Sequence, residues 1–211
     1  MSAIFVHLAV EGRLDEEVLR KAIQESRRPY QVMGCYGKKG KEDLNAKLPN
    51  FNQAARVSPW IVLRDLDHDA ECAPKLVRGL LPHPYPNLVF RVAVREVESW
   101  LLADTVNFSK FLGVGQERIA AQPDQIRNPK QELVGIARGS QRREIQEAIV
   151  PRAGSTSRVG KDYNGKLTEF VLKHWDVQRA RKKSPSLNKA MIALEKFRPA
   201  GLSKNQLKED T

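Results

Sequence analysis

The chain has 211 residues, of which 41% are hydrophobic and 29% are charged. This composition predicts a folded protein with a substantial core and argues against disorder. No stretch approaches the roughly 20 apolar residues that a membrane-spanning helix needs, and the mean hydropathy is −0.50, so we expect no membrane protein. The apolar start of the sequence runs into Glu11 without a basic leader or cleavage site, which predicts a first strand and no signal peptide. The two cysteines form neither a disulfide framework nor a zinc pattern, which favours the cytoplasm.

The positive charge is concentrated in the second half of the sequence. Lys and Arg number 36 against 25 Asp and Glu, a formal net charge of +11. Residues 1–104 contain 15 basic and 14 acidic side chains, whereas residues 105–211 contain 21 and 11. This excess predicts a polyanionic partner such as nucleic acid, held mainly by the second half of the chain.

The first half of the sequence predicts alternating strands and helices. Apolar runs predict strands over residues 4–10, 30–36, 60–63 and 88–94. Apolar residues at helical spacing predict helices from residue 15, over 42–56 and from residue 74. Since parallel strands need crossover connections, this order predicts an α/β fold, with a mainly parallel sheet of about four strands and helices on both faces.

The second half of the sequence predicts a helical region. The apolar spacing changes after Glu98, and helices are predicted over residues 131–137, 141–149, 167–175 and 187–197, with a small polar loop over 153–160. We divide the chain into an α/β core over 1–104 and a basic helical region over 105–211 that packs on it. The polar residues 203–211 are expected to fray. The default role for Trp60, Trp100 and Trp175 is packing in the core.

Carboxylates follow three of the four predicted strands. Glu11 follows the first strand, Asp65 and Asp67 end the third, and Glu96 and Glu98 follow the fourth. Carboxyl ends of parallel strands meet at one edge of a sheet, and an extended segment would turn both aspartates to the same side. Such a cluster needs a counter-cation, and oxygen ligands select Mg²⁺ or Mn²⁺. The pattern therefore predicts metal-assisted phosphoryl chemistry.

Simpler roles remain open for several of these residues. Asp15 is the kind of residue that caps a helix N-terminus, and Asp69 suits a loop or a cap. His68 suits an exposed loop, and Glu96 a solvated position on a strand. Gly12 after a strand commonly just makes a turn. Acids at the end of a buried strand, such as Asp65, are harder to explain without a bound group.

The order of these motifs resembles the Toprim domain. That fold is shared by topoisomerases, bacterial primases and overcoming-lysogenisation-defect nucleases. Its signature is a glutamate after the first strand and an Asp-x-Asp after the third, matched here by Glu11 and by Asp65-Leu66-Asp67. The match covers about residues 3–104. The length does not accommodate the accessory domains of topoisomerases or primases, so hydrolysis or a partner-dependent role is expected.

A narrower resemblance spans nearly the whole chain. The segments 94–104, 128–130 and 160–163 are similar to a family of small, stand-alone Toprim-like proteins of unassigned function. These are often encoded beside an ATPase of the structural-maintenance or recombination type. The resemblance implies a partner ATPase and a role in DNA processing or phage defence, with DNA favoured over RNA.

The Toprim resemblance implies an acidic metal site. Glu11, Asp65 and Asp67 match the family's metal-binding and catalytic acids. Asp15, four residues after Glu11, would help to hold a second metal, and Glu98 is our choice from the fourth strand. Two cations would activate water on one side of the scissile phosphate and stabilise the leaving oxygen on the other.

A basic residue should also meet the charge that develops on the phosphate. Lys161 is our candidate for this catalytic role. Arg95, Lys130, Arg158 and Lys161 are candidates for substrate binding, although surface lysines are usually only solvated.

Three functions compete at this stage. The first is a Mg²⁺-dependent nuclease, and the second is a phosphatase or phospho-acceptor. The second is discounted because haloacid-dehalogenase-type enzymes carry Asp-x-Asp after the first strand, and response-regulator receivers normally carry an acidic pair there. The third is a nucleic-acid-binding or interaction subunit with a vestigial acidic site, motivated by the basic second half. A homodimer is plausible in each case.

Overall fold

A computed structural model describes residues 3–200 of the chain, so the predicted fraying of 203–211 lies outside the described residues. Four strands form one parallel sheet in the order β2-β1-β3-β4. The strands are β1 (Ile4–Val10), β2 (Tyr30–Gly37), β3 (Trp60–Asp65) and β4 (Leu88–Ala93). The predicted α/β fold with about four parallel strands is confirmed.

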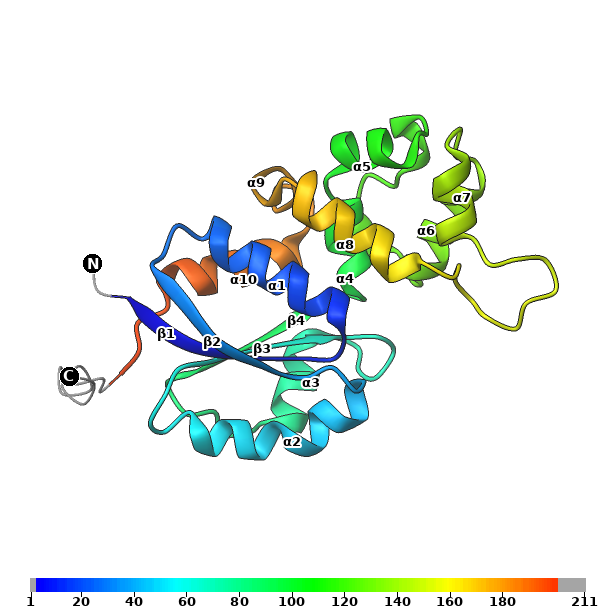
Figure 1. Ribbon diagram of the computed structural model, residues 1–211. Helices are drawn as coiled ribbons and strands as arrows, with labels where there is room; N and C mark the ends of the chain where they lie inside the picture. Colours follow the sequence, from blue (N-terminus) through cyan, green and yellow to red (C-terminus); the bar gives the residue numbers. More distant parts are fainter. Residues whose placement is uncertain (1–2, 201–211) are drawn as a thin grey trace, which may run out of the picture.

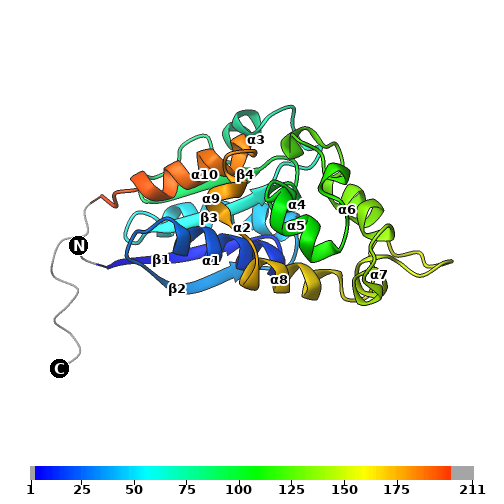
Figure 2. The ribbon, with the colours of Figure 1, turned by 90° about the horizontal axis from the view of Figure 1, so that it is seen from above.

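Helices cover both faces of this sheet (Figures 1 and 2). One face packs against α1 (Arg13–Glu25) and α10 (Pro185–Lys196), and the other against α2 (Lys41–Ala54) and α3 (Ala73–Leu80). Because side chains alternate along a strand, Val6 and Leu8 of β1 join the first layer and Ala9 joins the second. Every residue of the central strand β3 is buried, as expected for a strand covered on both faces.

The remaining helices lie beyond the carboxyl ends of the strands and along the outer side of α1 (Figure 1). They are α4 (Val97–Leu102), α5 (Thr105–Leu112), α6 (Pro129–Arg138), α7 (Arg143–Ile149), α8 (Tyr163–Lys173) and α9 (Val177–Ala180). The four helices predicted in this half are confirmed as α6, α7, α8 and α10, and the predicted loop lies between α7 and α8. Helix α9 and the 3-10 turns Gln116–Arg118 and Pro123–Gln125 are too short to show an apolar period, and the sequence did not predict them.

One apolar core joins the two halves of the sequence. It runs from Val6 in β1 to Leu194 in α10, so a helix from the basic half forms part of the layer that covers the sheet. Trp60, Trp100 and Trp175 are buried, which confirms their predicted place in the core. Within residues 3–200, no helix has the length and apolar character to cross a membrane.

Candidate functional site

A cavity of about 210 Å³ lies at the carboxyl ends of β1 and β3. Glu11 directly follows β1, and Asp65 is the last residue of β3. Asp15 lies in the first turn of α1, and Glu98 in the first turn of α4. All four line the cavity, together with Lys130 from the start of α6. The structure therefore brings together four of the five carboxylates predicted as metal ligands.

Glu11 is held against the end of β3. Its Oε1 accepts a hydrogen bond from the backbone N–H of Asp65 at 2.9 Å and lies 3.8 Å from Nε of Arg64. Burial and the nearby Asp15 and Asp67 carboxylates raise the pKa of Glu11 to about 7, against the lowering effect of the Asp65 N–H and Arg64. A carboxyl group with this pKa can both give and take a proton near neutral pH.

Asp65 links the end of the sheet to the helical half of the chain. Its Oδ1 accepts a hydrogen bond from the backbone N–H of Val97, the first residue of α4, at 3.0 Å. Burial raises the pKa of Asp65 well above its usual value, and the carboxylates of Asp15, Glu98 and Glu11 raise it further. The charged form is therefore unfavourable here unless a cation is nearby.

Two carboxylate oxygens in this cluster are buried without a hydrogen-bond partner. They are Oδ1 of Asp15, whose residue is 7% exposed, and Oε2 of Glu98, whose residue is 1% exposed. Burial raises the pKa of both groups. An unpartnered buried oxygen is costly, so these two atoms point to a proton or a cation at this place. The possible role of Asp15 as an N-cap is wrong, because Gly12 holds that position and Asp15 is the third residue of α1.

Gly12 allows Asp15 to fold back over the start of α1. A Cβ atom at position 12 would lie 2.8 Å from Oδ2 of Asp15. We expect Gly12→Ala to displace this carboxylate and to weaken Mg²⁺ binding about tenfold in calorimetry, the scale of losing a supporting group in a metal site. Gly79→Ala is the matched control, because a Cβ at that helical position meets nothing within 4 Å. Equal Mg²⁺ affinity in both variants would contradict a ligand role for Asp15.

Lys130 supplies a positive charge inside the cluster. Its Nζ lies 3.4 Å from Oε1 of Glu98 and 3.5 Å from Oε1 of Glu96. Burial lowers the pKa of Lys130, but the carboxylates of Glu98, Glu96 and Asp65 outweigh burial and raise it. Tyr163 of α8 donates a hydrogen bond to the same Glu98 oxygen at 3.0 Å. Part of the counter-charge that the sequence led us to expect from a metal is thus present in the chain.

Glu96 joins the end of β4 to the start of α6. It precedes α4, and its Oε2 accepts the backbone N–H of Lys130 at 2.8 Å. The alternative role of Glu96 as a solvated strand residue is therefore wrong. Its carboxylate caps the helix that carries Lys130, which fixes the lysine beside the cavity.

Asp67 is not among the residues that line the cavity. Its backbone has a φ of +47°, so the chain turns after β3 and the predicted extended segment through both aspartates is wrong. The Asp67 carboxylate pairs with Lys41 at 3.0 Å, and its carbonyl accepts a hydrogen bond from Arg95 at 2.8 Å. Asp67 is near enough to raise the pKa of Glu11, but it does not line the cavity.

The other predicted basic residues do not line the carboxylate cavity. Arg95 contacts the loop after β3 through Asp67. Lys161 lines a separate cavity of about 680 Å³ beside the α7–α8 loop, and Arg158 is exposed on that loop. The structure therefore places Lys130, and neither Lys161 nor Arg158, among the acids.

Arg64 and Tyr163 contribute to the site although the sequence did not single them out. The Arg64 side chain is buried between Asn45, Asp69 and the carbonyl of Asp65, so it fixes the end of β3. The sequence did contain a signal for Arg64, because an arginine at the end of a buried apolar run requires hydrogen-bond acceptors. Tyr163 lies in the segment 160–163 that carries the narrower resemblance, but nothing local marked its side chain as part of the site, because its partner Glu98 is 65 residues away in sequence.

The carboxylate oxygens are the donors that a hard cation prefers, but they are not grouped closely enough to hold one as they stand. Within residues 3–200, no group of three or more carboxylate, imidazole or thiol side chains is arranged to hold an ion. The four carboxylates line one cavity, and two of their oxygens are unpartnered. Oxygen donors without sulfur or imidazole match Mg²⁺ or Mn²⁺. The acids would have to turn further inward to bind such a cation together.

Comparisons with known proteins add no further assignment. No protein-family model matches the sequence, and neither a curated protein nor a solved structure matches the chain. What is established is the α/β fold with its four-stranded parallel sheet.

Proposed function

We propose that the chain is a Toprim-like, Mg²⁺- or Mn²⁺-dependent nuclease that hydrolyses phosphodiester bonds in DNA. The observation that carries the proposal is that Glu11, Asp15, Asp65 and Glu98 line one cavity at the carboxyl ends of parallel strands. Three buried acids, Asp15, Asp65 and Glu98, beside the half-buried Glu11 are a costly arrangement for a purely structural site. Glu11 after the first strand and Asp65 at the end of the third also occupy the places that the Toprim resemblance assigns to metal-binding acids.

Each group has a distinct role in this proposal. Asp65, Asp15 and Glu98 would hold the metal, which when bound polarises the phosphate and activates water. Glu11 exchanges a proton near neutral pH, in agreement with its raised pKa. Lys130 supports the charge that builds on the phosphate oxygens. The basic residues of the second half attract the polyanion, which the acids alone would repel.

The direct test is cleavage by the purified chain. We expect nicking or degradation of DNA with Mg²⁺ or Mn²⁺, and none with a chelator present. Binding to DNA should weaken steeply as salt rises, since phosphate contacts release counterions. Absence of cleavage with both metals, on single-stranded and double-stranded DNA and RNA, would contradict the proposal for the chain acting alone.

A second candidate is a non-catalytic nucleic-acid-binding subunit. The observation that favours it is that Lys130 already pairs with Glu98 and Glu96, and that the carboxylates do not converge on one point. Calorimetry separates the two candidates. Salt-dependent DNA binding without any Mg²⁺ binding would favour this second function.

The affinity for Mg²⁺ should rise with pH through about 7. The pKa of Glu11 is raised to about 7 in the fold, so this carboxyl group must lose a proton before it can act beside a cation. Calorimetry in two buffers of different ionisation enthalpy measures the released protons. Glu11→Gln should reduce the proton release and flatten the rise, whereas Glu71→Gln, at an exposed residue outside the site, should not. A pH-independent affinity in the unaltered protein would contradict this role for Glu11.

A further inference from the structure

Strand β4 forms one edge of the sheet. Within residues 3–200 it pairs with β3 alone. The carbonyls of Asn87 and Ala93 accept hydrogen bonds from the β3 side, so the backbone groups of Phe90 and Val92, at alternate positions, face outward. Val94, the next residue in this series, bonds through its N–H to Oγ of Ser186. The outward groups of Phe90 and Val92 therefore have no strand partner.

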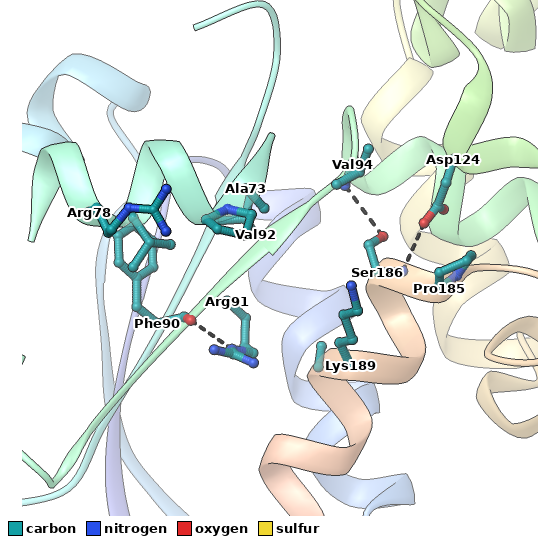
Figure 3. Close-up of a pocket in the computed structure, with 13 residues that line it drawn as sticks. Ala73, Arg78, Phe90, Arg91, Val92, Val94, Asp124, Pro185, Ser186 and Lys189 are labelled. Carbon is teal, nitrogen blue, oxygen red and sulfur yellow. Dashed lines mark hydrogen bonds between the residues drawn. The ribbon is translucent and has the colours of Figure 1, made fainter. Parts of the chain in front are cut away.

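A groove of about 520 Å³ runs along this open edge (Figure 3). It lies between α3 and α10, and it is unconnected with the carboxylate cavity. Its lining is mostly apolar, with Pro74 and Val77 from α3 and Phe90, Val92 and Val94 from the strand. The groove thus places the outward backbone groups of Val92, which have no strand partner, beside apolar walls, which is the arrangement that receives an added strand.

Three cations line the groove without acidic partners. Arg78 lies on α3, Arg91 on β4 and Lys189 on α10, and none of them forms a salt bridge within the described part of the chain. Arg91 is half-buried and donates only to the carbonyl of Phe90, at 2.6 Å. Burial lowers the pKa of Arg91, and no carboxylate opposes that effect. A half-buried guanidinium without an anion is unfavourable on its own.

The one carboxylate in the groove is already engaged. Asp124 accepts hydrogen bonds from Oγ of Ser184 and from the backbone N–H of Ser186, which together fix the start of α10. Asp124 therefore caps a helix, and the three cations remain available to a ligand.

We infer that this groove binds an extended acidic peptide segment of a partner protein, which adds a fifth strand to the sheet beside β4. The outward N–H and C=O groups of Val92 would pair with the peptide backbone. Alternate peptide side chains would enter the apolar wall beside Val77 and reach Arg78, Arg91 or Lys189 with carboxylates.

Charge argues against the other occupants. A second copy paired along the same edge would bring its own Arg78, Arg91 and Lys189 to the interface, and like charges facing each other are destabilising. Nucleic acid would use the cations but not the apolar lining or the backbone groups of the strand. The acidic peptide uses all three features.

A random peptide library selected on the full chain tests the inference. We expect the selected peptides to alternate apolar residues with Glu or Asp. Fluorescence anisotropy with a selected peptide, about eight residues long as strands commonly are, then gives its affinity. Val92→Pro removes one outward donor at a position where an edge strand tolerates proline, and should weaken binding about tenfold.

A double charge reversal provides a second test that leaves the backbone intact. Arg78→Glu combined with Lys189→Glu should also weaken the peptide about tenfold. Lys196→Glu, on the same α10 but outside the groove, should leave the affinity unchanged. Thermal unfolding checks that each variant folds.

Four outcomes would overturn the inference. The first is that the selected peptides share no acidic consensus, and the second is that they bind the double charge reversal as tightly as the unaltered protein. The third is that an oligonucleotide, whose own binding these variants weaken, displaces the peptide. The fourth is that sedimentation shows a dimer of the chain that Val92→Pro dissociates. The last would assign the edge to a second copy of the chain. None of these results depends on whether the acidic cavity is a nuclease site.

Discussion

Replacement of Asp65 by asparagine should abolish metal-dependent cleavage while the fold remains intact. Asparagine keeps an oxygen that can accept the hydrogen bond from Val97, so the link between β3 and α4 survives. It removes the negative charge at the centre of the four acids. We expect cleavage to fall at least about a hundredfold, since even groups that only support a metal ligand have effects approaching that size.

The same substitution should stabilise the metal-free protein at high pH. Burial raises the pKa of Asp65 in the fold well above its usual range, so the folded state holds a proton that the unfolded state releases. The stability that this proton contributes is present at acidic pH and is lost as pH rises through the folded pKa. The asparagine variant cannot ionise, and its melting temperature at alkaline pH should equal or exceed that of the unaltered protein.

These two readouts separate a chemical role from a structural one. Cleavage assays with Mg²⁺ and Mn²⁺ measure the first, and thermal unfolding without metal at acidic and alkaline pH measures the second. Asp43→Asn is a suitable control, because this acid pairs with Lys47 on the surface of α2. A folded Asp65→Asn protein that cleaves at the unaltered rate would refute the assignment of this site.

The sheet was predictable because its signals are local. Each strand is a short apolar run, and each helix of the first half shows its own apolar spacing, so the order of elements follows from the chain itself. The carboxyl ends of parallel strands lie at one edge of the sheet, which places Glu11 and Asp65 at the same edge. That the two ends are neighbours follows from the strand order β2-β1-β3-β4, which no local signal predicts.

The helical side of the site was not predictable in the same way. Lys130 reaches the cavity because Glu96, 34 residues earlier, caps α6, and Tyr163 reaches Glu98 across 65 residues. Such contacts depend on how α6 and α8 pack beyond the sheet, and no local pattern carries that information. Sequence reasoning therefore named Lys161 for the catalytic role and Lys130 only for substrate binding, whereas Lys130 is the lysine that lines the cavity.

The turn after β3 explains why Asp67, which the sequence predicted as a metal ligand, does not line the cavity. An Asp-x-Asp motif on an extended strand would face one side, but Asp67 adopts a positive φ and its carboxylate bonds to Lys41. Non-glycine residues seldom adopt this conformation, and aspartate is among those that tolerate it. The motif does mark the end of a strand, because Asp65 is the last residue of β3. The turn that follows leaves Asp65 in the cavity and brings Asp67 to Lys41 outside it.

Replacement of Lys130 by glutamine should destabilise the metal-free protein and make its stability depend on Mg²⁺. The ammonium group lies between Glu98 and Glu96, and its removal leaves the buried Glu98 without a cation. Breaking a fully buried pair costs about 3–5 kcal/mol. The Lys130 side chain is 38% exposed, so solvent screening reduces the expected loss to about 1–2 kcal/mol.

The way in which the stability of Lys130→Gln changes with pH and with Mg²⁺ shows whether Lys130 occupies the place of a metal cation. The loss should be largest at alkaline pH, where the raised pKa of Glu98 no longer keeps it protonated, and smallest in acid. If a cation binds among these carboxylates, Mg²⁺ should raise the melting temperature of Lys130→Gln more than that of the unaltered protein. Lys173→Gln, at an exposed pair with Glu169, is the control. If Mg²⁺ fails to stabilise Lys130→Gln, the charge of the acids is balanced by Lys130 alone, and this result would favour the non-catalytic function.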